Sequence, residues 1–253
     1  MDLKGKAAVI TGGGTGVGQA TGIELAKRGC SVLVNYSRSK TEAEETAKSI
    51  AGYGVKALTF KADVSVDSEC RAMIGTAKEE FGRLDILVNN AGTTRSVAHQ
   101  DLEGVTDEDW ERTLMVNLKG PFLCTRAAKD LLMDSGDGMI INVASIAGVK
   151  AVGSSIPYCA SKAGLINMTT ALARALAPDI RVNCVAPGFI DGSWLKKEFG
   201  KDFEALKQMY EQNAPLGKVC TPLDVADAIL SLITGSKLVT GQVVVCDGGI
   251  LLN

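Results

Sequence analysis

Tyr158 and Lys162 are the side chains of this sequence best suited to move a proton. They are four residues apart, so on a helix they would lie on one face. Pro157 suits the first turn of such a helix, and the alanine-rich run to residue 176 can continue it. A nearby ammonium favours the phenolate and lowers the pKa of a phenol. The pair predicts a tyrosine acid–base group, although a half-buried tyrosine beside a solvated lysine would show the same spacing.

Ser145 and Asn117 could complete this group. Ser145 follows the apolar run 139–144, which predicts a strand, and open α/β sheets bind ligands at the carboxyl ends of their strands. Its hydroxyl could hold a substrate oxygen without titrating. Asn117 lies in the apolar stretch 114–118, and a buried asparagine needs hydrogen-bond partners. It is either a structural hydrogen-bonding residue or part of a proton path.

A glycine-rich turn near the N-terminus is placed to receive a diphosphate. Residues 7–10 predict a buried strand and residues 19–28 a helix. Between them, backbone N–H groups and a helix N-terminus could bind a pyrophosphate. The spacing is Gly-x-x-x-Gly-x-Gly and not the common Gly-x-Gly-x-x-Gly, and close packing of the helix would also require glycines. The position directly after the first strand favours a nucleotide site.

The end of the second predicted strand, residues 31–36, indicates which dinucleotide binds. An acidic residue there would accept a hydrogen bond from the adenosine ribose and repel a 2′-phosphate, but this chain has Asn35 and Tyr36. Ser37 and Arg38 follow and offer a hydroxyl and a guanidinium to a phosphate. We therefore predict NADP, with NAD less favoured. The alternative is an ordinary polar loop.

Further βα units follow, with strands predicted at 55–60, 84–88, 180–185 and 242–246. Helices are expected at 67–81, at 224–233 and, as one long region, at 107–133. Asp63, after the third strand, could hydrogen-bond near an adenine or simply begin a turn. The small residues after the fourth strand, at 89–92, could let the backbone lie against a flat ligand. Pro187 and Gly188 then interrupt the pattern.

The segment 189–216 is charged and aromatic, and we expect it to form a lid over the substrate. Such an insertion after a strand end could equally be a packing or subunit-contact element. Trp194, Phe199 and Phe203 suggest an apolar wall, although they could face the protein interior instead.

Composition narrows the possible functions. The 253 residues are 46% hydrophobic and carry no Pro- or Ser-rich linker, so we expect one domain over residues 1–253. The net charge of −2, with both signs interspersed, indicates neither a nucleic-acid nor a membrane partner, which leaves small molecules. Seven cysteines without a C-x-x-C pair, and no signal-peptide pattern, suggest reduced thiols and a cytoplasmic location. His99 is the only histidine and lies in a polar loop, so we expect neither a histidine triad nor a metal site.

Taken in order, these motifs resemble the short-chain dehydrogenase/reductase family from Leu3 to the end of the chain. Within the family, segments 35–38, 88–95 and 185–190 are most similar to 3-oxoacyl-carrier-protein reductases and the related ketoreductases and glucose dehydrogenases. The markers are Thr11-Gly12-x-x-x-Gly16-x-Gly18, Asn89-Asn90-Ala91-Gly92, Asn117, Ser145, Tyr158-x-x-x-Lys162 and Pro187-Gly188.

The resemblance implies a single-domain Rossmann-type α/β fold, with a doubly wound seven-stranded parallel sheet in the order 3-2-1-4-5-6-7, helices on both faces, and usually a homotetramer built on the last two helices. It implies that Tyr158 exchanges a proton with the substrate oxygen, that Ser145 hydrogen-bonds that oxygen, and that Asn117 anchors a water in the proton path. Lys162 would hold the nicotinamide ribose and lower the pKa of the tyrosine. The cofactor-binding residues would be Gly12, Thr15, Gly16, Val17, Gly18, Ser37, Arg38, Asp63, Val64, Asn90, Ala91, Gly92, Tyr158, Lys162, Pro187, Gly188 and Ile190.

The chain departs from the family pattern in two places. Thr15 stands where some relatives use Arg or Lys to bind the 2′-phosphate, so selectivity would depend on Ser37 and Arg38. Residues 191–193, Asp-Gly-Ser, stand where relatives commonly have a threonine beside the nicotinamide. Ser193 could replace that threonine one position late, or the lid could be placed differently.

The function expected from these features is NADPH-dependent reduction of a ketone or a 3-oxoacyl thioester. The same four catalytic residues would also serve the oxidation of a sugar or steroid alcohol. A non-catalytic cofactor-sensing protein is the alternative from another class, and it is disfavoured because Tyr158 and Lys162 are both present. An isomerase or dehydratase of the extended subfamily is disfavoured because those chains are longer and carry a different glycine turn.

Overall fold

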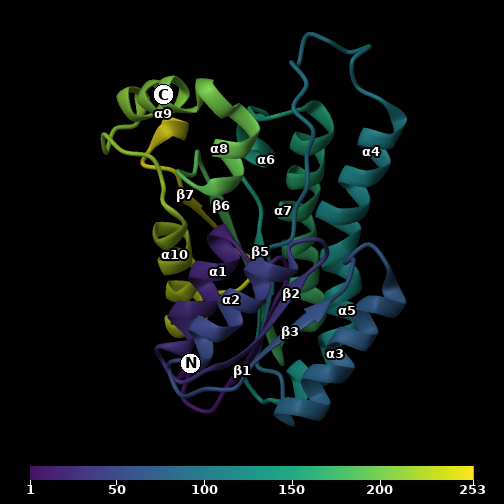
Figure 1. The fold of residues 1–253 in the computed structure, drawn as a ribbon. Helices are drawn as coiled ribbons and strands as arrows, with labels where there is room; N and C mark the ends of the chain where they lie inside the picture. The colour runs from purple at the N-terminus through teal and green to yellow at the C-terminus, as the bar shows by residue number, and fades with distance from the viewer. Residues whose placement is uncertain (253) are drawn as a thin grey trace.

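The computed structural model, which describes residues 1–252, contains one parallel sheet of seven strands (Figure 1). Their order is β3-β2-β1-β4-β5-β6-β7, which confirms the expected doubly wound arrangement. Such crossovers place helices on both faces, so the inner strands are short, apolar and buried. The strands are β1 (Ala7–Ile10), β2 (Ser31–Tyr36), β3 (Ala57–Lys61), β4 (Ile86–Asn89), β5 (Gly138–Val143), β6 (Ile180–Pro187) and β7 (Val243–Cys246).

Two helical layers cover the sheet (Figure 1). One contains α1 (Gly16–Ala26), α2 (Lys40–Ala51) and α10 (Pro222–Thr234), and the other α3 (Asp67–Phe81), α5 (Gly120–Asp134) and α7 (Ile156–Leu176). The helix α4 (Asp107–Leu114) and the π-helical turn η1 (Met115–Lys119) continue the second layer, since both contact α7 and Val116 lies in its core. The remaining helices are α6 (Ala147–Lys150), α8 (Ser193–Phe199), α9 (Phe203–Asn213) and the 3₁₀ turns η2 (Gly200–Asp202) and η3 (Ile250–Leu252).

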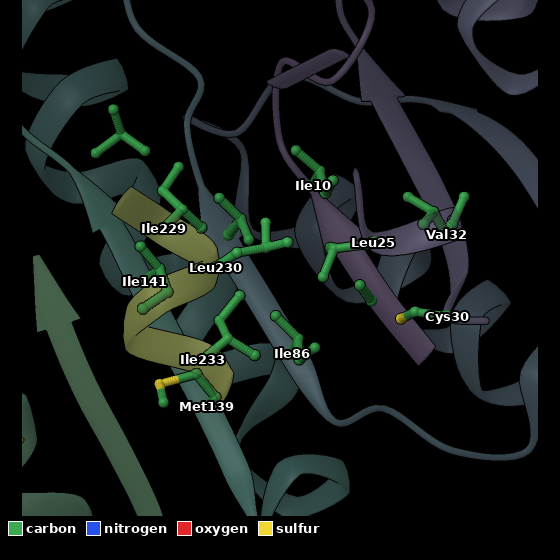
Figure 2. Close-up of a cluster of buried hydrophobic side chains, with 14 of the residues drawn as sticks. Ile10, Leu25, Cys30, Val32, Ile86, Met139, Ile141, Ile229, Leu230 and Ile233 are labelled. Atoms are coloured by element: carbon green, nitrogen blue, oxygen red, sulfur yellow. The ribbon is translucent and has the colours of Figure 1, made fainter. Parts of the chain in front are cut away.

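The core divides into two parts because side chains alternate along each strand. In β1, Ile10 packs toward α1 and α10, whereas Val9 packs toward α3 and α5. Figure 2 shows the first part, where Ile233 of α10 lies beside Ile86 of β4 and Ile229 lies nearer Ile141 of β5. All these side chains are fully buried, and each such burial stabilises the fold by about 1.5–3 kcal/mol. This packing fixes the strand ends that carry the site.

The single helix expected over residues 107–133 is interrupted, which corrects that prediction. The turn η1 lies between α4 and α5, and the N–H of Gly120 bonds to the carbonyl of Met115, five residues before it. Pro121 gives a physical reason. It has no N–H to donate to the carbonyl of Asn117, so the regular α-helical bond cannot form there. Asn117 therefore lies in a π-helical turn between two helices.

Candidate active site

A cleft of about 640 Å³ opens along the carboxyl ends of the strands, where this fold class binds ligands. It brings together nearly all the predicted catalytic and cofactor-binding residues. Of these, only Gly18 and Asn117 do not line it. The predicted residues that line the cleft are Gly12, Thr15, Gly16, Val17, Ser37, Arg38, Asp63, Val64, Asn90, Ala91, Gly92, Ser145, Tyr158, Lys162, Pro187, Gly188 and Ile190.

The glycine turn at one end of the cleft has the geometry of a diphosphate cradle. Gly12 and Gly16 have φ values of +60° and +55°, which favour glycine. A Cβ on Gly18 would lie 2.5 Å from the carbonyl oxygen of Gly12 and 2.7 Å from Nδ2 of Asn90. That Nδ2 donates to the carbonyls of Thr11, at 3.0 Å, and Gly12, at 2.9 Å. The turn is thus held open at the start of α1, whose N-terminus faces the cleft.

Asn35 supports this turn, a role that the sequence analysis missed. Its Oδ1 accepts from the N–H of Gly12 at 3.1 Å, and its Nδ2 donates to the carbonyl of Ala62 at 3.0 Å. The side chain is 1% exposed. Both ends of its amide are bonded inside the protein, so the amide is not free to bind a ribose. Ser37 and Arg38, in contrast, are exposed at the edge of the cleft.

Asp63 begins a turn, which is one of the two roles expected for it. Its Oδ1 accepts from the backbone N–H and the hydroxyl of Ser65, at 2.9 and 2.6 Å. Its Oδ2 pairs with Arg112 at 3.0 Å. Burial opposes ionisation of Asp63, but these partners outweigh it and hold the pKa of the carboxyl below its usual value. The charge of Arg112, which also lines the cleft, is therefore already engaged.

Tyr158 and Lys162 lie on α7, and Ser145 lies just beyond β5, all facing the cleft. The Lys162 ammonium donates to the carbonyl of Val143 at 2.8 Å and lies 5.7 Å from the centre of the Tyr158 ring. Gly148 lets α6 lie close against α7, because a Cβ there would lie 2.5 Å from the backbone of Lys162. No motif had singled out Gly148.

Burial has the largest effect on the pKa values of Tyr158 and Lys162. It raises the pKa of Tyr158 to about 12, against the opposing effect of a hydrogen bond with Ser145, and it lowers the pKa of Lys162 to about 8. The predicted lowering of the Tyr158 pKa by Lys162 is therefore wrong for this structure, since desolvation has the larger effect. At neutral pH the phenol keeps its proton, which suits a proton donor.

Asn117 serves as a structural hydrogen-bonding residue, one of the two roles expected for it. Its Nδ2 donates to the carbonyl of Thr93 at 2.9 Å and to the hydroxyl of Ser161 at 3.1 Å. Its Oδ1 accepts from the N–H of Thr93 at 2.8 Å. The Ser161 hydroxyl in turn donates to the backbone carbonyl of Tyr158 at 2.7 Å. Asn117 thus ties the segment after β4 to the turn of α7 that carries Tyr158.

The helices α8 and α9 form the remaining wall of the cleft. Trp194, Phe199 and Tyr210 line it, and Trp194 is 49% exposed. Phe203 does not line it: its side chain is buried against Phe189, with the ring centres 5.6 Å apart. Of the two orientations expected for Phe203, the structure therefore shows the one toward the interior, because α9 turns this position inward.

Comparisons with known proteins agree with this geometry. The sequence model of a family described as Enoyl-(Acyl carrier protein) reductase matches residues 12–251. A protein assigned as a ketoacyl reductase of the granaticin polyketide synthase of Streptomyces violaceoruber is 42% identical over 243 residues, covering 96% of this chain and 94% of that protein. A 3-oxoacyl-[acyl-carrier-protein] reductase from Synechocystis is 36% identical over 253 residues, covering 99% and 98%. This chain belongs to the short-chain dehydrogenase/reductase family.

Solved structures place this short-chain dehydrogenase/reductase in the same fold. A Burkholderia xenovorans protein assigned to the family superposes with a TM-score of 0.92 at 35% identity, covering 98% of each chain. NAD⁺-bound xylitol dehydrogenase superposes with a TM-score of 0.89 at 26% identity, covering 98% of this chain and 100% of that one. The protein is accordingly an oxidoreductase, most similar to the ketoreductases of its family.

Among residues 1–252 of this short-chain dehydrogenase/reductase, no three His, Cys, Asp or Glu side chains gather as metal ligands. His99 contacts the thiol of Cys159 at 3.9 Å and does not line the cleft. The seven cysteines are free thiols, as expected. None of the helices in this part of the chain is long and apolar enough to cross a membrane.

Proposed function

We propose that this protein uses NADPH to reduce a ketone or a 3-oxoacyl thioester. The observation that carries the proposal is the position of a protonated, partly exposed Tyr158 beside Lys162 and Ser145 in the cleft that also holds the glycine turn. The names of the relatives, which include a 3-oxoacyl-[acyl-carrier-protein] reductase and a ketoacyl reductase, support this substrate class.

The residues of the cleft fit a dinucleotide. The positive φ values of Gly12 and Gly16 bring backbone close to the cleft, and the N-terminus of α1 offers N–H groups to a diphosphate. The small residues at 90–92 leave room for a flat ring beside Lys162. When bound, the nicotinamide supplies the hydride.

The protein's own residues supply the proton and hold the substrate oxygen. Ser145 donates a hydrogen bond to the carbonyl oxygen, and Tyr158 gives its proton to the same oxygen as negative charge develops there. An alkoxide is more basic than a phenolate, so this transfer is favourable even with a tyrosine pKa of about 12. The Lys162 ammonium then stabilises the phenolate that remains. In this proposal Asn117 keeps Tyr158 in position and anchors a water in the path that returns a proton to Tyr158.

A carbonyl panel tests the substrate class. Purified protein with NADPH should turn over a 3-oxoacyl thioester or a simple ketone faster than a sugar or a steroid. The panel includes an enoyl thioester because the matching family model is described as an enoyl reductase. Turnover of the enoyl thioester or of a sugar without turnover of any ketone would overturn the proposal. Binding of NADPH without turnover of any member would support a cofactor-sensing protein instead.

Arg38 is expected to set the cofactor preference. With Ser37 it lies exposed at the adenosine end of the cleft, and the Asn35 amide between the strands is fully occupied. Arg38→Ala should raise the KM for NADPH about tenfold or more, because one charge-assisted phosphate contact contributes about 1.5–3 kcal/mol. The KM for NADH should stay unchanged.

Lys40→Ala is the matched control, since Lys40 is exposed nearby, pairs with Glu44 at 3.6 Å and does not line the cleft. It should alter neither KM. The solved xylitol dehydrogenase binds NAD⁺. If the wild type turned over substrate with NADH as fast as with NADPH, or faster, the NADP assignment would be contradicted.

We further propose a cytoplasmic homotetramer with α8 and α9 acting as a lid. The support for a subunit contact is an apolar edge: Val245 of the edge strand β7 is 40% exposed, and Leu238, just before it, is 95% exposed. Exposed edges of this kind are commonly covered by a partner.

A further inference from the structure

Asp191 joins the end of β6 to both helices that wall the cleft. Its Oδ2 accepts from Nζ of Lys207, on α9, at 2.7 Å, and its Oδ1 lies 2.8 Å from Nζ of Lys196, on α8. The contact with Lys196 lacks regular hydrogen-bond geometry, so it is an ion pair. Both ammonium groups lower the pKa of the Asp191 carboxyl. One carboxylate thus anchors two separate helices.

The backbone of Asp191 is itself fixed. Its N–H donates to the carbonyl of Cys220 at 2.7 Å, and the preceding residue, Ile190, pairs with Cys220 as an isolated β-bridge. Ile190 lines the cleft, whereas Asp191 does not. Asp191 therefore offers a firm anchor directly behind the cleft wall without being part of it.

The two helices present apolar side chains to the cleft from the turns next to these lysines. Trp194 and Leu195 precede Lys196 on α8, and Leu206 precedes Lys207 on α9. Apolar packing of these helices is confined to one small cluster. In it Phe203, the only fully buried residue of α8 and α9, packs with Phe189 and Val219, and the partly buried Phe199 and Tyr210 extend it. Because this cluster is separate from the two parts of the core, an ionic anchor can decide the position of the helices.

We propose that Asp191 is a positioning residue, which clamps α8 and α9 so that their apolar side chains form a wall selecting bulky, apolar ketones over small ones. The inference rests on the proposed reductase function. It assigns the substrate preference to a wall that the carboxylate holds in place. A small ketone does not reach this wall, so its reduction does not depend on the clamp.

Kinetics with two ketones test the clamp. Asp191→Asn keeps the shape but removes the charge, and it should raise the KM for a bicyclic aromatic ketone such as 1-tetralone about tenfold. The kcat for that ketone, and both constants for ethyl acetoacetate as the small ketone, should change less than about twofold. Added salt should raise the KM of the wild type for 1-tetralone part of the way toward that of the variant, because salt weakens partly exposed ion pairs such as Asp191–Lys196.

Glu211→Gln is the matched control. Glu211 also pairs with Lys207, at 3.8 Å, but both residues lie on α9, so their contact does not join α9 to the sheet. This variant should leave both KM values unchanged. Equal changes for the two ketones in Asp191→Asn, or no change at all, would contradict the clamp even though ketone reduction itself persisted.

A fluorescence measurement tests the clamp without any turnover. The chain has two tryptophans, and Trp110→Phe leaves Trp194, on α8, as the only one. In this background Asp191→Asn should increase acrylamide quenching of Trp194, and Glu211→Gln should not. Unchanged quenching would overturn the inference whatever substrate the enzyme uses. Absence of ketone turnover in the wild type would instead refute the proposed function and leave the quenching result to decide on the clamp.

Discussion

Tyr158→Phe should lose at least about a thousandfold in kcat while binding NADPH normally. The change removes the one hydroxyl that can deliver a proton to the substrate oxygen, and positioned acid–base groups contribute about 10²–10⁴-fold. Phenylalanine keeps the ring and therefore its packing on α7. Initial rates with saturating ketone, together with a fluorescence titration of NADPH, measure the two effects separately.

Tyr53→Phe controls for loss of a phenol as such, since Tyr53 is 48% exposed and does not line the cleft. It should retain full activity. Reduction by Tyr158→Phe at a rate within about tenfold of wild type would remove this tyrosine from the mechanism, because general acid catalysis should contribute more.

Lys162→Met should abolish most activity yet stabilise the protein. Burial lowers the pKa of Lys162 from 10.5 to about 8, which at about 1.4 kcal/mol per unit means that the charged form costs the fold about 3 kcal/mol at pH 7. Loss of the hydrogen bond to the Val143 carbonyl offsets roughly 2 kcal/mol of this. The net gain in the free energy of unfolding should be about 1 kcal/mol, while kcat falls about a hundredfold or more.

The cost of burying the charged form of Lys162 should make stability depend on pH. Below pH 8 both the folded and the unfolded wild type hold the proton on Lys162, so the full cost is present. Between pH 8 and 10.5 the unfolded chain binds the proton that the folded protein has lost, so wild-type stability rises with pH. Urea unfolding should show the advantage of Lys162→Met shrinking over this window.

Lys129→Met, at an exposed position of α5, should show no such pH dependence. A constant stability difference between Lys162→Met and wild type from pH 7 to 10 would mean that burial does not govern the ionisation of Lys162.

Motifs on short segments were predictable because the chemistry needs fixed spacing. The position of Tyr158 and Lys162 on one helix, and of Gly12 and Gly16 in a turn after the first strand, follows from local sequence alone. The strand order followed from the family resemblance. These features depend on residues that are close in sequence or on a pattern shared by the whole chain.

Contacts between distant segments were not predictable in the same way. Asn35 was noted only as standing where an acidic residue would bind a ribose, but its amide bonds to Gly12 and Ala62, whose proximity depends on the packed sheet. The ionisation of Tyr158 was predicted from its nearest charge, whereas the whole surrounding structure determines its desolvation. The aromatic spacing left open whether Phe203 lines the cleft or faces the interior, and the packing of α9 buries it. The interruption at Pro121 did have a local signal, because proline cannot donate to the carbonyl four residues before it.

The most direct measurement is a crystal structure of the protein with NADP⁺ and a ketone bound together. The account predicts that the Tyr158 hydroxyl and the Ser145 hydroxyl both lie about 3 Å from the ketone oxygen, with the nicotinamide on the Lys162 side of the cleft and the diphosphate at the glycine turn. A complex in which the Tyr158 hydroxyl points away from the ketone oxygen, or in which the diphosphate lies outside the turn, would contradict it.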